Sequence, residues 1–250
     1  MLQTSKNTRV RATTTITTAK YCYEMTGKVR IPRSIFNNQF TLPDWRMLSY
    51  CLVAEFIAPS FLEARRFVDD VIDAAESLDH HPDIDIRYPG TVRITVTTHA
   101  VNGLTDLDAK LAATISELAT KRSIVATPAG VAVLDVAIDA LDIAAIIPFW
   151  KAVLGYVDEP PHNLGEPVDA IMDPLRIGPP IWFQQMDNPR PQRNRIHFDL
   201  RVPHDVAEDR INTAVAAGGR LLNSDAARAF WVLADPEDNE ICICTWQDRD

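Results

Sequence analysis

In the first half of the chain, apolar positions alternate with polar ones in some stretches and recur every three to four residues in others. Alternation predicts a β-strand with one buried face, and it covers residues 44–56, 84–88 and 92–97. The first of these stretches is either one strand or a hairpin, and the pattern does not locate a turn in it. This half of the chain is therefore expected to contain a sheet.

Two predicted helices complete this half. Ser60 stands three residues before Glu63, which is the pattern of a capping box, and apolar positions keep helical spacing from there to about Asp79. Thr105 and Asp108 repeat the capping pattern ahead of a second helix, whose apolar positions run to Leu118. Both helices are therefore predicted with defined N-termini.

The second half of the chain shows two successive rounds of strand, helix and further strands. Helices are predicted at residues 141–154, closed by Gly155, and at residues 206–217, stopped by Gly218. Strands are predicted at residues 131–138, 181–186, 195–202, 230–233 and 241–245. The two rounds imply an internal structural repeat, and the segment before them, residues 122–130, is expected to be a linker.

Composition limits the possible functions. The 250 residues are 46% hydrophobic, which is enough for the cores of two ordinary domains, and the net charge of −9 disfavours nucleic acid and anionic membranes as partners. The four cysteines form neither a C-x-x-C pair nor a dense disulfide framework, so we expect reduced thiols and a cytoplasmic protein. Residues 1–30 lack the apolar run of a signal peptide and are expected to form a loosely ordered extension.

Three of the six histidines are concentrated in one short part of the sequence. His80, His81 and His99 lie within twenty positions and are flanked by the carboxylates Glu76 and Asp108. Histidine gives and takes protons near neutral pH, so this group predicts a general acid–base site. Glu76 and His80 are four residues apart, and on a helix that spacing would direct the carboxylate at the imidazole.

The histidines stand inside two longer motifs. Glu-x-x-x-His-His-Pro begins at Glu76, and Thr-His-x-x-x-Gly-Leu-Thr-x-x-Asp begins at Thr98. With the Leu-Pro-Asp-Trp sequence that ends at Trp45, they resemble the signature of the pterin-4a-carbinolamine dehydratases over roughly residues 44–120. The matching positions are Glu76, His80, His81, Pro82, Thr98, His99, Gly103, Leu104, Thr105 and Asp108. Asn102 departs from the resemblance, because a second glycine is usual there.

The resemblance implies loss of water from a 4a-hydroxytetrahydropterin to give the quinonoid dihydropterin. It implies His80 and His99 as the acid–base pair, with Glu76 and Asp108 orienting and charge-tuning the histidines. The expected substrate-binding residues are Trp45, His81, Pro82, Thr98 and Gly103. The pterin is the substrate, so no metal or organic cofactor is expected, and such relatives commonly assemble, so we also expect a homo-oligomer.

Plainer roles remain open for several of these residues. Asp108 could serve as a helix cap, alone or in addition to a catalytic role, and Glu76 could be a solvated helix carboxylate. Pro82 and Gly103 could do no more than end a helix and permit a turn. A zinc site built from the three histidines is less favoured, because adjacent histidines at a helix end diverge and no cysteine lies near them in sequence.

The second half carries its own motifs. Phe-Trp-Lys-Ala-Val-Leu-Gly-Tyr begins at Phe149, Arg-Ile-His-Phe-Asp at Arg195, and Ala-Asp-Pro-Glu-Asp-Asn-Glu at Ala234. Over about residues 131–246 they resemble the glyoxalase-like branch of the vicinal oxygen chelate superfamily. The resemblance implies two paired βαβββ modules around a cupped sheet, often with a divalent metal inside.

The metal positions of that superfamily fall on Asp135, Gln184, His197 and Cys242. A hard-cation site needs oxygen and imidazole donors, so the cysteine argues against it and we expect no metal. Two alternatives remain. A small-molecule pocket would use Asp135, Gln184, His197 and Asp199. Otherwise His197 and Asp199 are a polar pair, and the nearby aromatic residues Trp182, Phe183, Phe230 and Trp231 are core.

These expectations combine into an α+β protein with two domains. Residues 31–121 would form a dehydratase-like antiparallel sheet with helices on one face, and residues 131–250 the glyoxalase-like modules. The leading hypothesis is a carbinolamine dehydratase that uses histidine acid–base catalysis. The alternatives are small-molecule binding or metal-dependent chemistry in the C-terminal domain, with the N-terminal domain a non-catalytic pterin-binding or dimerisation module.

Overall fold

The computed structural model describes residues 28–160, 169–189 and 197–248. Most of the extension expected at residues 1–30 lies outside these ranges. The described chain divides into two compact units, one ending at Val133 and the other beginning at Leu134. None of the helices in the described parts combines the length and the apolar character that crossing a membrane requires. Each unit is treated below by itself.

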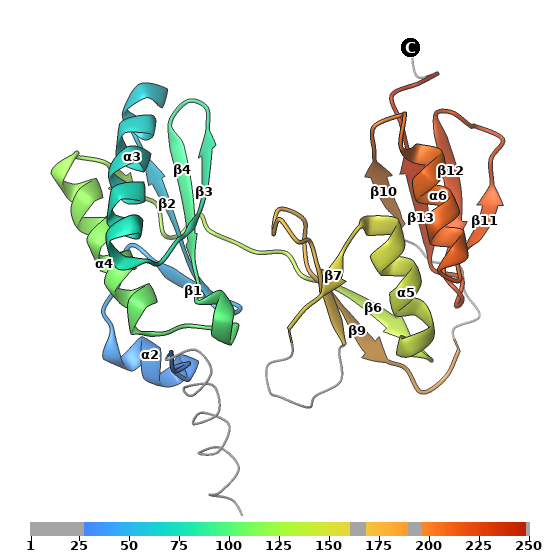
Figure 1. The fold of residues 1–250 in the computed structure, drawn as a ribbon, viewed down its shortest axis with the longest axis horizontal. Helices are drawn as coiled ribbons and strands as arrows, with labels where there is room; N and C mark the ends of the chain where they lie inside the picture. Colours follow the sequence, from blue (N-terminus) through green and yellow to red (C-terminus); the bar gives the residue numbers. More distant parts are fainter. Residues whose placement is uncertain (1–27, 161–168, 190–196, 249–250) are drawn as a thin grey trace, which may run out of the picture. The chain divides into compact units, whose positions relative to one another are not determined.

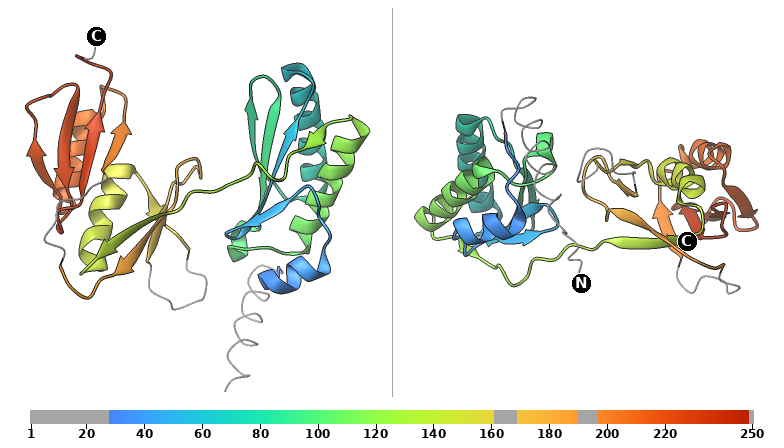
Figure 2. Two further views of the ribbon diagram at one scale, coloured as in Figure 1. Left: turned by 180° about the vertical axis from the view of Figure 1, so that it is seen from behind. Right: turned by 90° about the horizontal axis from the view of Figure 1, so that it is seen from below.

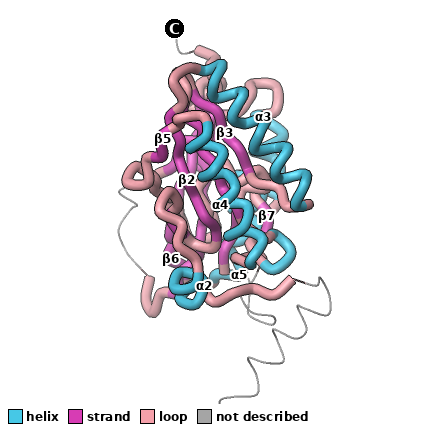
Figure 3. The backbone as a smooth tube through the Cα atoms, turned by 90° about the vertical axis from the view of Figure 1, so that its left-hand side faces the viewer, coloured by secondary structure: helices cyan, strands magenta, loops and turns pink. Residues whose placement is uncertain are grey.

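The N-terminal unit is an antiparallel sheet with two long helices on one face. Its elements are α2 (Arg33–Gln39), β1 (Arg46–Leu48), β2 (Cys51–Ile57), α3 (Phe61–Leu78), β3 (Asp83–Arg87), β4 (Thr91–Val96), η1 (His99–Val101), α4 (Asp106–Lys121) and β5 (Val125–Ala126). The strand order is β1-β2-β4-β3, with β5 also paired to β2. Helices α3 and α4 pack together and lie against the same face of the sheet (Figures 1 and 3).

Both helix N-termini form as the capping patterns predict. The Ser60 side chain accepts a hydrogen bond from the backbone N–H of Glu63, and Thr105 and Asp108 form a complete capping box. The stretch predicted at residues 44–56 is a hairpin, with its turn at Ser49 in the left-handed region (φ 53°). The expected linker is partly wrong, because β5 lies within it and extends the sheet along β2.

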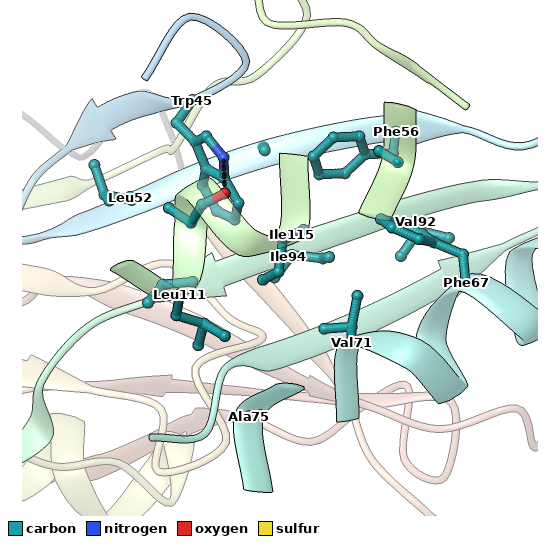
Figure 4. Close-up of a cluster of buried hydrophobic side chains, with 14 of the residues drawn as sticks. Trp45, Leu52, Phe56, Phe67, Val71, Ala75, Val92, Ile94, Leu111 and Ile115 are labelled. Atoms are coloured by element: carbon teal, nitrogen blue, oxygen red, sulfur yellow. Dashed lines mark hydrogen bonds between the residues drawn. The ribbon is translucent and has the colours of Figure 1, made fainter. Parts of the chain in front are cut away.

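The core of this unit lies between the sheet and the two helices. Figure 4 shows Trp45 and Phe56 from the strand side meeting Ile115 of α4 and Phe67 of α3. The Trp45 indole N–H donates to the backbone carbonyl of Ala112, so the largest side chain of the cluster has its polar atom satisfied (Figure 4).

The C-terminal unit repeats one βαβββ module twice. The first module contains β6 (Val136–Ala140), α5 (Ile143–Leu154), β7 (Val157–Asp158), β8 (Ala170–Met172) and β9 (Ile181–Gln185). The second contains β10 (Phe198–Arg201), α6 (Ala207–Ala216), β11 (Arg220–Asn223), β12 (Phe230–Ala234) and β13 (Glu240–Cys244). In each module the first strand pairs in parallel with the last, and the other pairs are antiparallel.

The two helices of this unit pack against each other, and Figure 2 shows each beside its own sheet. The predicted helices and most predicted strands are present. The first strand begins at Val136 rather than residue 131, and the short strands β7, β8 and β11 were not predicted. The chain before Phe198 was predicted as strand from residue 195, and residues 195 and 196 lie outside the described residues.

One turn between β12 and β13 connects the two modules. The backbone N–H groups of Leu141 and Asp142, at the start of α5, both donate to the Glu237 carboxylate at 2.7 and 2.6 Å. Asp235 is fully buried, and its Oδ2 accepts from the Trp150 indole at 3.0 Å. The Asp-Pro-Glu motif thus binds the segment just before α5, while the N-cap of that helix is Asp142 itself.

Candidate active site

The candidate site of the N-terminal unit is organised around the carboxylate of Asp108, which has no exposed surface. Its Oδ1 lies 2.9 Å from His80 Nε2. Its Oδ2 accepts from the Thr98 hydroxyl at 2.7 Å and from the Thr105 backbone N–H at 2.6 Å. Asp108 therefore acts as helix cap and histidine partner at once, and both of the roles considered for it are compatible.

His80 reaches Asp108 because of how α3 ends. The helix stops at Leu78, and Asp79 follows in the left-handed conformation (φ 46°), which turns the next residue out of the helical path. His80 is consequently only 5% exposed. The expected pairing of Glu76 with His80 is wrong, since that spacing rule applies only while the helix continues. Glu76 Oε1 instead lies 3.1 Å from His81 Nε2, and both side chains are exposed.

The contact with Asp108 defines how the His80 ring can behave. An ionised carboxylate only accepts hydrogen bonds, so Nε2 of His80 carries the proton that lies between the two groups. The other ring nitrogen, Nδ1, takes no part in this contact. A buried carboxylate in this position also fixes the orientation of the ring, as the aspartate of a catalytic triad does.

His99 is linked to the hydrogen bonds of Asp108 through the preceding residue, Thr98. It is the first residue of η1, it is exposed, and it directly follows Thr98, which is bonded to Asp108. The Thr98 backbone N–H donates to the Gly103 carbonyl at 2.9 Å and so closes the loop that carries His99. Asn102 takes the left-handed conformation there (φ 41°), which asparagine tolerates better than most residues.

The sheet register explains why the two histidine-bearing segments meet. Asp83, three residues after His80, pairs with Thr95, four residues before His99. The end of α3 and the end of β4 therefore lie at the same edge of the sheet, and Asp108 at the start of α4 joins them. Among the described residues, the three histidines do not bring their ring nitrogens close enough to form a shared metal site.

The expected substrate-binding residues occupy different positions. Trp45 is 3% exposed and belongs to the core, so we correct its role to packing. Thr98 is buried and bonded to Asp108, whereas His81 is exposed. Gly103 is buried, and a Cβ there would come within 2.7 Å of the Arg30 side chain, which gives the glycine a packing reason. The bond of Thr98 to Asp108 could not be assigned from sequence, because it depends on how the end of β4 meets the start of α4.

Of the four residues of the predicted C-terminal pocket, His197 and Asp199 lie together. Gln184 lies on β9 of one sheet, and His197 and Asp199 lie at and within β10 of the other, 3.5 Å apart between His197 Nε2 and Asp199 Oδ1. Asp135, just ahead of β6, instead acts on Glu159, whose carboxyl pKa is raised by burial and then by this neighbouring charge. Trp182, considered as core, is 43% exposed, whereas Phe183 and Trp231 are buried and Phe230 is half-buried.

Cys242, the position that argued against a hard cation, faces Asp199 across the parallel pair β10–β13. Burial and the Asp199 carboxylate raise the pKa of the Cys242 thiol to about 11. His197, Asp199 and Cys242 bring their potential ligand atoms within 4.8 Å of one another. The superfamily resemblance already grouped His197 with Cys242, and His197 and Asp199 were expected as a polar pair or pocket residues; only the approach of Asp199 to Cys242 was not expected.

Comparisons with known proteins agree with the two-part organisation. Residues 32–118 match the family described as pterin 4 alpha carbinolamine dehydratase, and residues 135–244 match a glyoxalase-like domain. A Chloroflexus aurantiacus protein named "Putative pterin-4-alpha-carbinolamine dehydratase" is 46% identical over 76 residues, which are 30% of this chain and 81% of that protein. A protein of the same name from Nocardia farcinica is 47% identical over 78 residues, covering 31% and 81%.

Two solved structures show similarity, each over less than half of the chain. One, titled transcriptional coactivator/pterin dehydratase from Brucella melitensis, is 30% identical and covers 36% of this chain and 98% of its own, with a TM-score of 0.34. A glyoxalase-related enzyme from Fulvimarina pelagi is 19% identical. The match covers 46% of this chain and 86% of that enzyme, also with a TM-score of 0.34.

The sequence relatives decide the assignment, because more than 40% identity extends over about four-fifths of their length. The motif residues around Asp108 lie within the matched region. The chain therefore belongs to the pterin-4-alpha-carbinolamine dehydratase family and carries, in addition, a glyoxalase-like domain.

Proposed function

We propose that the N-terminal domain dehydrates a 4a-hydroxytetrahydropterin to the quinonoid dihydropterin, with His80 and His99 as the acid–base pair. The observation that supports this most directly is the buried Asp108 carboxylate. It is bonded to His80 through one oxygen and to Thr98, the residue before His99, through the other. A single fixed group thus orients one histidine and anchors the loop of the second.

The reaction breaks the bond between C4a and its hydroxyl oxygen and removes the proton on N5, so that one water leaves and a double bond forms between C4a and N5. In our proposal the protonated His80 ring, oriented by Asp108, delivers its Nδ1 proton to the departing hydroxyl. His99 accepts the N5 proton. The proton gained by one histidine and lost by the other then returns through solvent, and the cycle requires no redox partner.

The remaining motif residues have supporting roles in this proposal. His81, exposed and next to His80, contacts the pterin together with Pro82, while Glu76 holds the His81 ring. Thr98 and Gly103 shape the loop that presents His99. The domain uses the pterin as substrate and needs no cofactor.

The test is stopped-flow dehydration of a freshly generated carbinolamine by the full-length protein. His80→Ala and His99→Ala should each lower the catalysed rate by about 10²–10⁴-fold, the range for loss of a general acid or base. His204→Ala, which removes an exposed histidine of the C-terminal unit, is the matched control and should leave the rate unchanged.

His80 is buried, so its variant must first show the circular dichroism of the unmodified protein. His99 is exposed, and its variant tests the proposal even if His80→Ala does not fold. A wild-type rate no faster than buffer would overturn the proposal. Tight pterin binding without turnover would favour the non-catalytic alternative instead.

A further inference from the structure

Two arginines of the N-terminal unit interact with the Tyr50 ring. The guanidinium carbons of Arg30 and Arg33 each lie 5.0 Å from the centre of that ring, which is the geometry of a cation–π contact. Arg30 precedes the residues that match the dehydratase family, and Arg33 is the first residue of α2. The proposed dehydration assigns no role to either arginine.

Hydrogen bonding and packing hold Arg30 beside the loop that carries His99. The backbone N–H of Ile31 donates to the Leu104 carbonyl at 2.8 Å, which fixes the chain around Arg30 along that loop. The Arg30 side chain covers Gly103, because its Nε lies 2.7 Å from the place where a Cβ of that residue would be. Figure 1 shows α2 and the green segment that contains η1 at the same end of this unit.

Tyr50 is joined to the same loop. Strands β2 and β4 pair Leu52 with Val96, so Tyr50, which precedes β2, lies beside the residues that follow β4. The Thr97 hydroxyl donates to the Tyr50 carbonyl at 3.0 Å, and Thr97 stands two residues before His99. The Tyr50 ring and both guanidinium groups therefore lie near the proposed base.

The structure of the pterin ring indicates which part of the substrate would meet the two arginines. In a tetrahydropterin, N5 is bonded to both C4a and C6. The proposed function assigns the N5 proton to His99, and the present inference rests on that assignment. The side chain on C6 is therefore the part of the substrate that begins next to His99, on the side of the loop that Arg30 covers.

We propose that Arg30 and Arg33 bind a phosphate or carboxylate group on the C6 side chain, so that the preferred substrates are pterins whose C6 side chain is negatively charged. A guanidinium keeps its charge at every relevant pH, and its forked N–H donors match the oxygens of these groups. Contact with the Tyr50 ring orders both side chains before the substrate arrives, which lowers the entropic cost of binding.

The charges around this pair fit an anionic ligand. Arg33 is exposed, and its guanidinium donates to the Ser49 carbonyl at 3.4 Å, a neutral acceptor that leaves the positive charge in place. The whole chain has a net charge of −9 and repels anions at long range. An anionic substrate therefore needs a local group of cations, and the two arginines supply one beside His99.

The experiment compares two carbinolamines that differ only in charge, the 4a-hydroxytetrahydropterin with a hydroxymethyl group on C6 and the phosphate ester of that alcohol. For the full-length protein, kcat/KM should be about tenfold or more higher for the ester, as expected for hydrogen bonds to a charged group. Arg30→Gln and Arg33→Gln should each remove most of this preference, by raising KM for the ester more than KM for the alcohol. Higher ionic strength should also reduce the preference.

Arg65→Gln is the matched control, because it removes the same charge from an exposed position on α3 and should keep the preference for the ester. Arg33→Lys keeps the charge without the forked donors and should retain only part of the preference. Arg30 packs against the loop of His99, so its replacement could disturb that histidine. Arg33 is exposed, and its variant tests the proposal independently.

The possible outcomes separate this inference from the proposed function. Equal kcat/KM for the two substrates, an unchanged preference in Arg33→Gln, or an equal loss of preference in Arg65→Gln would overturn the inference and leave dehydration itself in place. Inorganic phosphate should raise KM for the ester more than for the alcohol. If it binds at the two arginines while both substrates react equally, the site is one for a free anion and the inference is overturned. A protein that dehydrates neither substrate would overturn both proposals.

Discussion

His80 Nε2 and Asp108 Oδ1 lie 2.9 Å apart, and together the two side chains are almost completely withdrawn from water. Twenty-eight residues separate them in the sequence. A pair of this kind is costly to break, because a buried group that loses its partner is left without a hydrogen bond. The same contact therefore bears on both the stability of the N-terminal unit and the orientation of the proposed catalytic ring.

We expect Asp108→Asn to lower the dehydration rate by about 10²-fold or more, because an amide no longer fixes the tautomer and orientation of the His80 ring. The variant should also lose about 1–3 kcal/mol of unfolding free energy. Stopped-flow rates across pH and urea unfolding measure the two effects. Asp106→Asn, at an exposed position in the same helical turn, is the control and should change neither by a comparable amount. An unaltered pH–rate profile for Asp108→Asn would contradict the positioning role.

Glu76→Gln should have a much smaller effect, since the carboxylate and the His81 ring that it contacts are both exposed. Exposed ion pairs contribute about 0–1 kcal/mol. We expect KM for the pterin to change more than kcat, because His81 is assigned to binding. Steady-state kinetics distinguish the two parameters. A loss of kcat as large as that of His80→Ala would restore the original pairing of Glu76 with His80.

We expect the Asp70 carboxylate to make the free energy of unfolding depend on pH in the acid range. Its hydrogen bond with the Arg122 guanidinium lowers the pKa of the carboxyl below its ordinary value. A depressed folded-state pKa stabilises the protein above the unfolded-state value, and that contribution is lost as the pH falls through the folded-state value. The pair is partly exposed, so the effect should be below about 1 kcal/mol.

Urea unfolding of the N-terminal unit at pH 7 and near pH 3 provides the measurement for this pair. Asp70→Asn should be less stable than the unmodified protein at pH 7 and nearly equal to it at the acid pH. Asp69→Asn, at the neighbouring exposed position, serves as the comparison. A stability difference for Asp70→Asn that is the same at both pH values would rule out the titration as its cause.

Asp235→Ala should destabilise the C-terminal unit by about 3 kcal/mol or more. The Asp235 carboxylate accepts from the Trp150 indole and from the backbone and side-chain amides of Asn239, all of which would lose their partner. Thermal unfolding should show the affected transition shifting while dehydration activity persists at lower temperature. Asp238→Ala, in the same turn but exposed, should shift it far less. Equal shifts for both variants would show that Asp235 has no special role.

Structural features that depend only on residues close together in the sequence could be predicted. The N-termini of α3 and α4 follow from Ser60 and Thr105, whose side chains bond within their own first turns. The strands β7 and β11 were not predicted, because they are short and exposed and show no alternation. Residues 131–135 were wrongly assigned to a strand, which begins only at Val136.

In the candidate sites, too, the local features could be predicted and the long-range contacts could not. The histidines and Asp108 could be selected from spacing and residue type, but their pairing could not, since it depends on the left-handed turn at Asp79. The approach of Asp199 to Cys242 follows from a parallel register between strands about forty residues apart, which no local pattern records. In both units, the sequence identifies candidate site residues, and the tertiary structure decides which of them meet.

The short strand β5 has a practical consequence for anyone dissecting this protein. Strand β5 pairs with the edge of β2. The Thr127 N–H extends this pairing by donating to the Glu55 carbonyl at 2.8 Å, so part of the β2 edge is covered. A fragment that ends at Lys121 would leave this edge of β2 exposed. Another copy of the fragment could then pair with the edge, and the fragment would tend to self-associate. A fragment carried through Gly130 keeps the edge covered, and is the better starting point for isolating the N-terminal half.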